Sequence, residues 1–154
     1  MVARQAEPRW AAPRRMPAVR PLNQAERVHL AAEIVAAYAQ ARRELRRAPI
    51  TTVMARLRTQ SSAIAPATAT HGTLEEARRL GRAVARTLSL LPGDTRCLVR
   101  SLVLTRLLAR RGIPAKLVIG ARAAPDFLAH AWVEYAGDPV LSPGDGSFAR
   151  LVEL

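Results

Sequence analysis

The chain has 154 residues, 49% of them hydrophobic, and a formal net charge of +12, with Lys116 as its only lysine. This length suffices for one domain, the hydrophobic content excludes a disordered chain, and no apolar stretch of about 20 residues predicts a membrane span. The charge indicates an acidic partner, such as nucleic acid, a membrane surface, nucleotide phosphates or an acidic peptide, unless the arginines are simply solvated.

Residues 1–22 form an N-terminal arm by composition. They contain five arginines and four prolines, a mixture that disfavours helix, and they lack the apolar region of a signal peptide. We expect an extended arm that docks through Trp10. A single domain over residues 23–154 follows it.

Helices are predicted for the first part of this domain. Asn23 and Glu26 have the spacing of a capping box that opens a helix to Arg47. Its apolar positions follow helical spacing: Val28, Ala31, Ala32, Val35, Tyr38 and Leu45. A short helix over 52–58 and a loop over 59–72 come next.

A second capping box, Thr73 with Glu76, predicts a helix that extends to about Leu90. Its apolar face has five members: Leu74, Ala77, Leu80, Val84 and Leu88. The residues "TRCLVRSLVLTRLLARRG" then predict an amphipathic helix from about Thr95 to Arg111, which Gly112 would end.

Strands are predicted only after these helices. Residues 115–123 read as a buried strand, and residues 130–142 as a hairpin that turns at Gly137 and Asp138. The expected fold is therefore α+β, with helices first and a small antiparallel sheet after the helix that carries the cysteine.

Cys97 and His130 are the candidate catalytic residues. Cys97 lies in the first turn of its predicted helix, where unpaired backbone N–H groups favour a thiolate. His130 would act as the base and then protonate a leaving amine, and the backbone N–H of Cys97 would supply part of an oxyanion hole. The structural alternative is a small core cysteine and a surface histidine.

An acidic or amide group should orient the imidazole. Glu134 lies two pleats further along the strand than His130, and Asp138 in the turn lies about 20 Å or more away at ~3.3 Å per residue. A hairpin that turns at Gly137 would bring Asp145 back level with His130. We therefore assign Asp145 as the third candidate.

The remaining histidines and the single cysteine limit other kinds of site. His29 is expected on a helix surface and His71 in a loop, and neither has a predicted role. One cysteine excludes an intrachain disulfide and favours a reduced, cytoplasmic location. The one cysteine and three histidines lack the spacing of metal ligands, so no metal site is predicted. The sequence also has no Gly-rich loop of the kind that binds the phosphate groups of a cofactor.

Three motifs between residues 97 and 141, "CLVRSL", "RRGIPAKLVIG" and "AHAWVEY", resemble the transglutaminase-like cysteine peptidases of lasso-peptide biosynthesis. The resemblance implies a papain-like α+β core with a Cys-His-Asp triad that cleaves the leader from a ribosomally made precursor. Cys97 would be the nucleophile and His130 the base, whereas Ser142 stands within "VLSPGD", where the family acid is expected.

The same resemblance implies partners. These are a leader-recognition protein that is separate from this chain, and a cyclase that acts afterwards. Some members of the family are reported to need ATP. Two other interpretations stay open. The first is a basic nucleic-acid-binding module built on "ARRELRRAP" (41–49), and the second is a non-catalytic scaffold, which Ser142 would favour.

Overall fold

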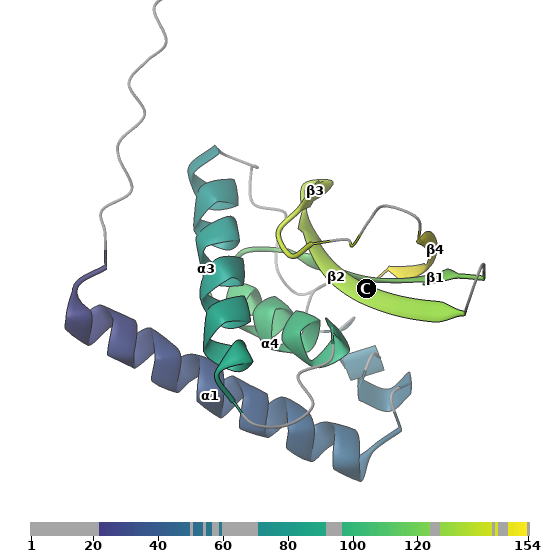
Figure 1. Ribbon diagram of the computed structural model, residues 1–154, viewed down its shortest axis with the longest axis horizontal. Helices are drawn as coiled ribbons and strands as arrows, with labels where there is room; N and C mark the ends of the chain where they lie inside the picture. Colours follow the sequence, from purple (N-terminus) through teal and green to yellow (C-terminus); the bar gives the residue numbers. More distant parts are fainter. Residues whose placement is uncertain are drawn as a thin grey trace, which may run out of the picture.

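The computed structural model places three main helices beside one small sheet (Figure 1). It describes residues 22–49, 51–53, 55–56, 59, 71–91, 97–123, 127–142, 144 and 148–153. Trp10, Asp94, Thr95 and Asp145 lie outside these described residues. The α+β class expected from the sequence is the one observed.

Helix α1 spans Gln24–Arg47 and begins at the predicted capping box. The Asn23 side chain accepts from the Glu26 backbone N–H at 2.8 Å, and the Glu26 carboxylate accepts from the Asn23 backbone N–H at 2.7 Å. These two reciprocal bonds satisfy donors that the first turn would otherwise leave unpaired.

The predicted apolar face of α1 was partly wrong. Val28 and Val35 are 65% and 40% exposed, whereas Ile34 is fully buried. The buried residues of the helix are Ile34, Ala37, Tyr38 and Ala41. Alanines occur on every side of this helix, so helical spacing alone did not show which face turns toward the core. The face that carries Ile34 is buried, because burying this larger side chain stabilises the fold more than burying alanine does.

Helix α3 spans His71–Ser89, so His71 begins the helix instead of ending a loop. Thr73 therefore lies inside the first turn, and the predicted capping box of Thr73 with Glu76 was wrong. The predicted face was confirmed, with these members buried: Ala77, Leu80, Val84 and Leu88. A Cβ on Gly81 would lie 2.6 Å from the Val140 carbonyl oxygen, so glycine lets the helix approach the chain after β3.

Helix α4 spans Cys97–Arg110 and lies at the centre of the molecule. It packs against α1, α3, β1 and β2, and this enclosure explains why most of its residues are buried. The fully buried leucines are Leu102, Leu104, Leu107 and Leu108. None of the helices in the described part of the chain is both long and apolar enough to cross a membrane.

The sheet has the strand order β3-β2-β1-β4, and every neighbouring pair is antiparallel. The strands are β1 (Lys116–Arg122), β2 (Leu128–Tyr135), β3 (Asp138–Pro139) and β4 (Ala149–Glu153). In the β1–β2 register Leu117 pairs with Val133, and both belong to the core with the helices. The sequence did not predict β4, whose five residues are all exposed.

The hairpin turns one residue earlier than the sequence predicted. Ala136 and Gly137 form the turn, with φ angles of 52° and 87°, so that Tyr135 pairs with Asp138. Two consecutive positive φ angles are the mark of a type I′ turn, whose twist matches the flanking strands. A two-residue loop at these positions places Asp138 in β3 and not in the turn.

Candidate active site

Cys97 is the first residue of α4 and is half-buried, and its thiol is free. The four first N–H groups of a helix have no partner within the helix, so a group at this place meets a positive local potential. The sequence also offers Asp94 or Thr95 as the capping residue of this helix, but both lie outside the described residues, so their capping role stays a prediction.

His130 lies on β2 opposite Gly120 of β1. Its Nε2 atom is 3.0 Å from the backbone carbonyl oxygen of Ser142. A carbonyl oxygen only accepts, so Nε2 carries a proton, and in the corresponding neutral tautomer the lone pair is on Nδ1. The Ser142 hydroxyl accepts the backbone N–H of Gly144 at 3.2 Å, which helps to set the course of the chain here.

Two aromatic rings flank the imidazole. The Trp132 ring stacks at 6.0 Å between centroids and 18° between planes, and the Phe148 ring lies at 5.2 Å and 34°. A Cβ on Gly120 would lie 2.9 Å from the Trp132 ring and 2.8 Å from the Ala149 carbonyl oxygen. Glycine at this position therefore lets Trp132 lie flat over β1.

Glu134 is buried and fixes Trp132 in turn. The Trp132 indole N–H donates to the Glu134 carboxylate at 2.7 Å, and the Arg150 guanidinium donates to the same oxygen at 2.8 Å. Arg150 also donates to Glu153 at 2.9 Å, and this hydrogen bond, followed by the charge of Glu134, raises the pKa of Arg150. Neither of these partners is His130, so in the described part of the chain Glu134 holds Trp132 and not the imidazole.

The chain alternates across β2 and so separates these residues from the core. Val133 and Tyr135 join the hydrophobic core with the helices, while His130, Trp132 and Glu134 share the other face. We call this face, with Phe148 and Arg150, the outer face of the sheet. Helix α4 packs against β2, but no hydrogen bond in the described part of the chain joins Cys97 to His130.

The acidic candidates separate as follows. Asp138 is half-exposed and forms an ion pair with Arg78 at 3.6 Å, at the far end of the hairpin from His130. Asp145 lies outside the described residues, and so its role stays a prediction. Gly144, the residue before it, approaches the imidazole: a Cβ there would lie 3.7 Å from the His130 ring.

Sequence reasoning missed three features of this site. The contact of Trp132 and Glu134 could have been found from the sequence, because both residues lie at even spacing from His130 and so share its face of the strand. Phe148 directly precedes β4, a strand that was not predicted. The Ser142 carbonyl carries no signal at all, because a backbone acceptor depends on the path of the chain and not on the side chain.

A family model described as the Transglutaminase-like superfamily matches residues 44–153, which is well over half of the chain. The chain belongs to the transglutaminase-like superfamily. The matched region includes Cys97, His130 and the whole sheet. Searches of curated proteins and of solved structures gave no significant match.

No group of three or more His, Cys, Asp or Glu residues in the described ranges is placed to hold a metal ion. The residues around the imidazole are instead aromatic rings and a main-chain carbonyl.

Proposed function

We propose that this chain is a cysteine peptidase that removes the leader peptide from a lasso-peptide precursor, with Cys97 as nucleophile and His130 as general base and acid. The observation that carries the proposal is the imidazole of His130, whose Nε2–H is bound to the Ser142 carbonyl at 3.0 Å and whose ring is flanked by Trp132 and Phe148. A fixed ring with one free nitrogen is what proton transfer to and from a thiol requires.

The proposed reaction uses both residues twice. His130 takes the proton of Cys97, and the thiolate attacks the carbonyl carbon of the scissile amide. The backbone N–H of Cys97 donates to the oxyanion, and the imidazolium protonates the leaving amine, so the C–N bond breaks and a thioester forms. His130 then removes a proton from water, which attacks the thioester, frees the leader's carboxylate and returns the thiol.

Contact between the two residues must form when substrate binds, since no hydrogen bond joins them in the free chain. Catalytic hydrogen bonds are often long before the Michaelis complex forms. Helix α4 begins with Cys97 and packs against the core face of β2, whereas His130 lies on the outer face of that strand, so the packing by itself does not join the two residues.

The third member of the site has two candidates. Asp145 is proposed from the sequence, and the Ser142 carbonyl already accepts a hydrogen bond from the Nε2–H group of His130. A main-chain acceptor can hold the imidazole in one tautomer without an acidic side chain. Ser142 therefore gives little support to the interpretation that this domain is a non-catalytic scaffold.

Family resemblance supplies the proposed partners: the precursor peptide, a separate leader-recognition protein and a cyclase, in the cytoplasm. A dependence on ATP stays part of this proposal. The decisive experiment incubates the chain with a lasso-peptide precursor and with the recognition protein, and follows the leader by mass spectrometry. We expect cleavage by the wild type and none by Cys97→Ala.

Two controls make this experiment decisive. Thermal unfolding and circular dichroism should show that Cys97→Ala keeps the fold, because a half-buried thiol is replaced by a smaller group. If Cys97→Ala cleaves the precursor as fast as the wild type does, Cys97 is not the nucleophile. An intact precursor in every reaction, together with salt-sensitive retention of nucleic acid in a gel, would favour the basic binding module.

A further inference from the structure

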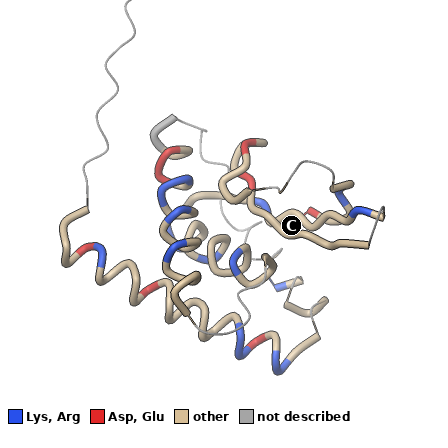
Figure 2. The backbone as a smooth tube through the Cα atoms, viewed as in Figure 1, with Lys and Arg blue, Asp and Glu red and all other residues tan. Residues whose placement is uncertain are grey.

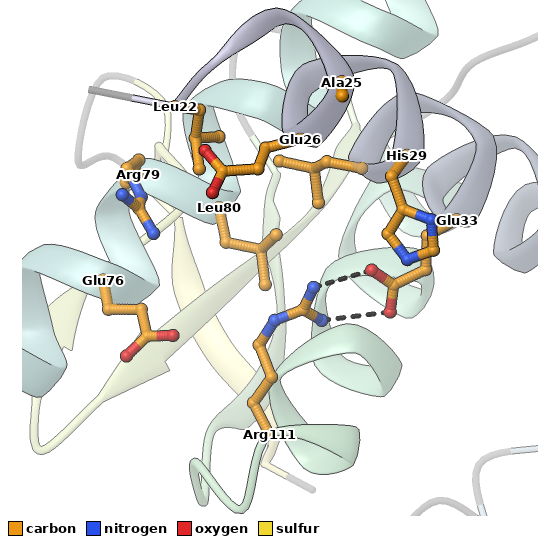
Figure 3. A pocket seen from close by; sticks show the side chains of 10 residues that line it. Leu22, Ala25, Glu26, His29, Glu33, Glu76, Arg79, Leu80 and Arg111 are labelled. Atoms are coloured by element: carbon orange, nitrogen blue, oxygen red, sulfur yellow. Dashed lines mark hydrogen bonds and ion pairs between the residues drawn. The ribbon is translucent and has the colours of Figure 1, made fainter. Parts of the chain in front are cut away.

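A groove between α1 and α3 offers a surface unrelated to the candidate site. It has a volume of about 380 Å³, and its apolar lining includes Leu22, Leu30, Ala31 and Ala83. A second hollow of about 400 Å³ adjoins it and shares Leu22, Leu30 and Arg79 with it (Figure 3). Hollows of this size and lining accept a few apolar side chains of a ligand or partner.

The charges of the two hollows differ. Three arginines line the first one: Arg27, Arg79 and Arg86. None of the three forms an ion pair within the described part of the chain. In the adjoining hollow, Arg111 is bound by Glu33 at 2.6 and 3.1 Å (Figure 3). The first hollow, which Arg27 and Arg86 line without any carboxylate, therefore combines an apolar floor with positive charge that has no acidic partner in the described part of the chain.

The groove lies far from the candidate nucleophile. Arg111, at the adjoining hollow, follows the last residue of α4, whereas Cys97 is the first. At about 1.5 Å per residue, the 14 residues of α4 separate the two ends by roughly 20 Å. A ligand in this groove would leave Cys97 accessible.

We propose that this groove docks an acidic amphipathic peptide segment of a partner protein, whose apolar side chains enter the hollow and whose carboxylates pair with Arg27, Arg79 and Arg86. Arginine pairs well with carboxylates through its planar fork of donors. The inference goes beyond the proposed function, because it concerns binding and holds whether or not Cys97 is catalytic.

Charge and chemistry select this occupant over three others. Residues 1–21 carry five arginines and one glutamate, so the chain's own N-terminal segment has the wrong sign. A second copy, at a net charge of +12, would be repelled as a whole. Nucleic acid would use aromatic rings for stacking, and the groove lining contains aliphatic side chains instead.

The test measures binding of a fluorescent peptide made of repeated Glu-Leu-Leu-Glu units by fluorescence anisotropy, using the full chain. Arg79→Glu combined with Arg86→Glu should weaken binding at least about tenfold, because two attractions become repulsions. The matched control is Arg43→Glu with Arg82→Glu, which lowers the charge by the same four units but lies outside the groove lining. We expect a change of less than about twofold there.

Each outcome decides the proposal. If both double variants weaken peptide binding equally, the binding reflects attraction by net charge and not docking in the groove. Binding that survives replacement of every leucine of the probe by serine, or no saturable binding at low salt, would also overturn it. A single-stranded DNA probe that depends on Arg79 and Arg86 more strongly than the peptide would assign the groove to nucleic acid.

Two further measurements complete the test. Arg79→Gln with Arg86→Gln should give an intermediate loss, which a misfolded double variant would not reproduce, and thermal unfolding should match the wild type. Cys97→Ala should bind the peptide like the wild type. The loss of precursor cleavage and the loss of peptide binding in the groove are therefore separate results, and each tests its own proposal.

Discussion

The outer face of the sheet and the groove between α1 and α3 both contain arginines, but in opposite states. On the outer face, Arg150 binds Glu134 and Glu153, and Lys116 lies 3.4 Å from Glu153. In the groove, Arg79 and Arg86 have no acidic partner in the described part of the chain. The positive charge seen along α3 in Figure 2 is thus not equivalent to that near β4.

This difference separates structural charge from charge available to a partner. The carboxylate of Glu134 is buried and needs both its donors, because an unpaired buried charge is costly. Of the groove arginines, Arg27 and Arg86 are exposed and Arg79 is half-buried, so water can reach their guanidinium groups and leaving them unpaired costs little. The net charge of +12 therefore says less about binding than the question of which arginines already have an acidic partner within the chain.

The largest effect should come from Glu134. Glu134→Ala leaves the Trp132 N–H without its buried acceptor and should destabilise the fold by about 3 kcal/mol. Arg79→Ala in the groove should change stability by less than about 0.5 kcal/mol. Urea unfolding of both variants measures the contrast, and Glu134→Gln should recover part of the loss. Similar values for Glu134→Ala and Arg79→Ala would contradict the distinction.

Gly120→Ala should disturb the outer face with less effect on the core. The added Cβ would meet the Trp132 ring at 2.9 Å and the Ala149 carbonyl oxygen at 2.8 Å, at a cost of about 1–3 kcal/mol. Because Trp132 stacks on His130, we also expect slower precursor cleavage and an altered pH profile. Gly112→Ala is the stability control for a glycine with no atom within 4 Å, although its φ of 69° adds strain. An unchanged Trp132 fluorescence in Gly120→Ala would disprove the displacement.

Asp145→Asn tests whether the outer face holds His130 through the main chain. Since the Ser142 carbonyl accepts from Nε2, we expect turnover to fall by no more than about tenfold. Asp138→Asn, at the far end of the hairpin, should leave turnover unchanged. A loss of several orders of magnitude in Asp145→Asn alone would restore Asp145 as the orienting acid. Single-turnover kinetics with the precursor measures both variants.

The smallest effect concerns the paired charge beside the groove. A hydrogen bond from Arg111, opposed by partial burial, lowers the pKa of Glu33 from its ordinary 4.5. The depressed pKa stabilises the fold above pH 4.5, and this stability is lost as pH falls through the folded pKa. Glu33→Gln should remove up to about 1 kcal/mol at neutral pH and flatten the acid limb of stability. Thermal unfolding across pH would refute this if the two curves stay parallel.

Part of this protein was predictable from local sequence. The capping box of Asn23 with Glu26 opens α1 because its bonds join residues three apart, and the apolar face of α3 follows from simple periodicity. Cys97 at a helix start and His130 on a strand were likewise predictable from the motifs around them. The transglutaminase-like superfamily followed from the same residues, because its motifs are short and contiguous.

Other features depended on contacts between distant segments. The rotation of α1 was decided by which side chains met α3 and α4, and the sequence alone favoured Val28 and Val35, which are exposed. The turn moved by one residue because Ala136 adopts a positive φ beside Gly137.

The acceptor for His130 was beyond sequence reasoning for a physical reason. Every residue has a backbone carbonyl, so nothing in the side chain at Ser142 distinguishes its oxygen from the others. Only the path of the chain after β3 brings that oxygen to 3.0 Å from Nε2. The sequence determined which side chains can do chemistry, and the tertiary structure decided which main-chain atoms hold them in place.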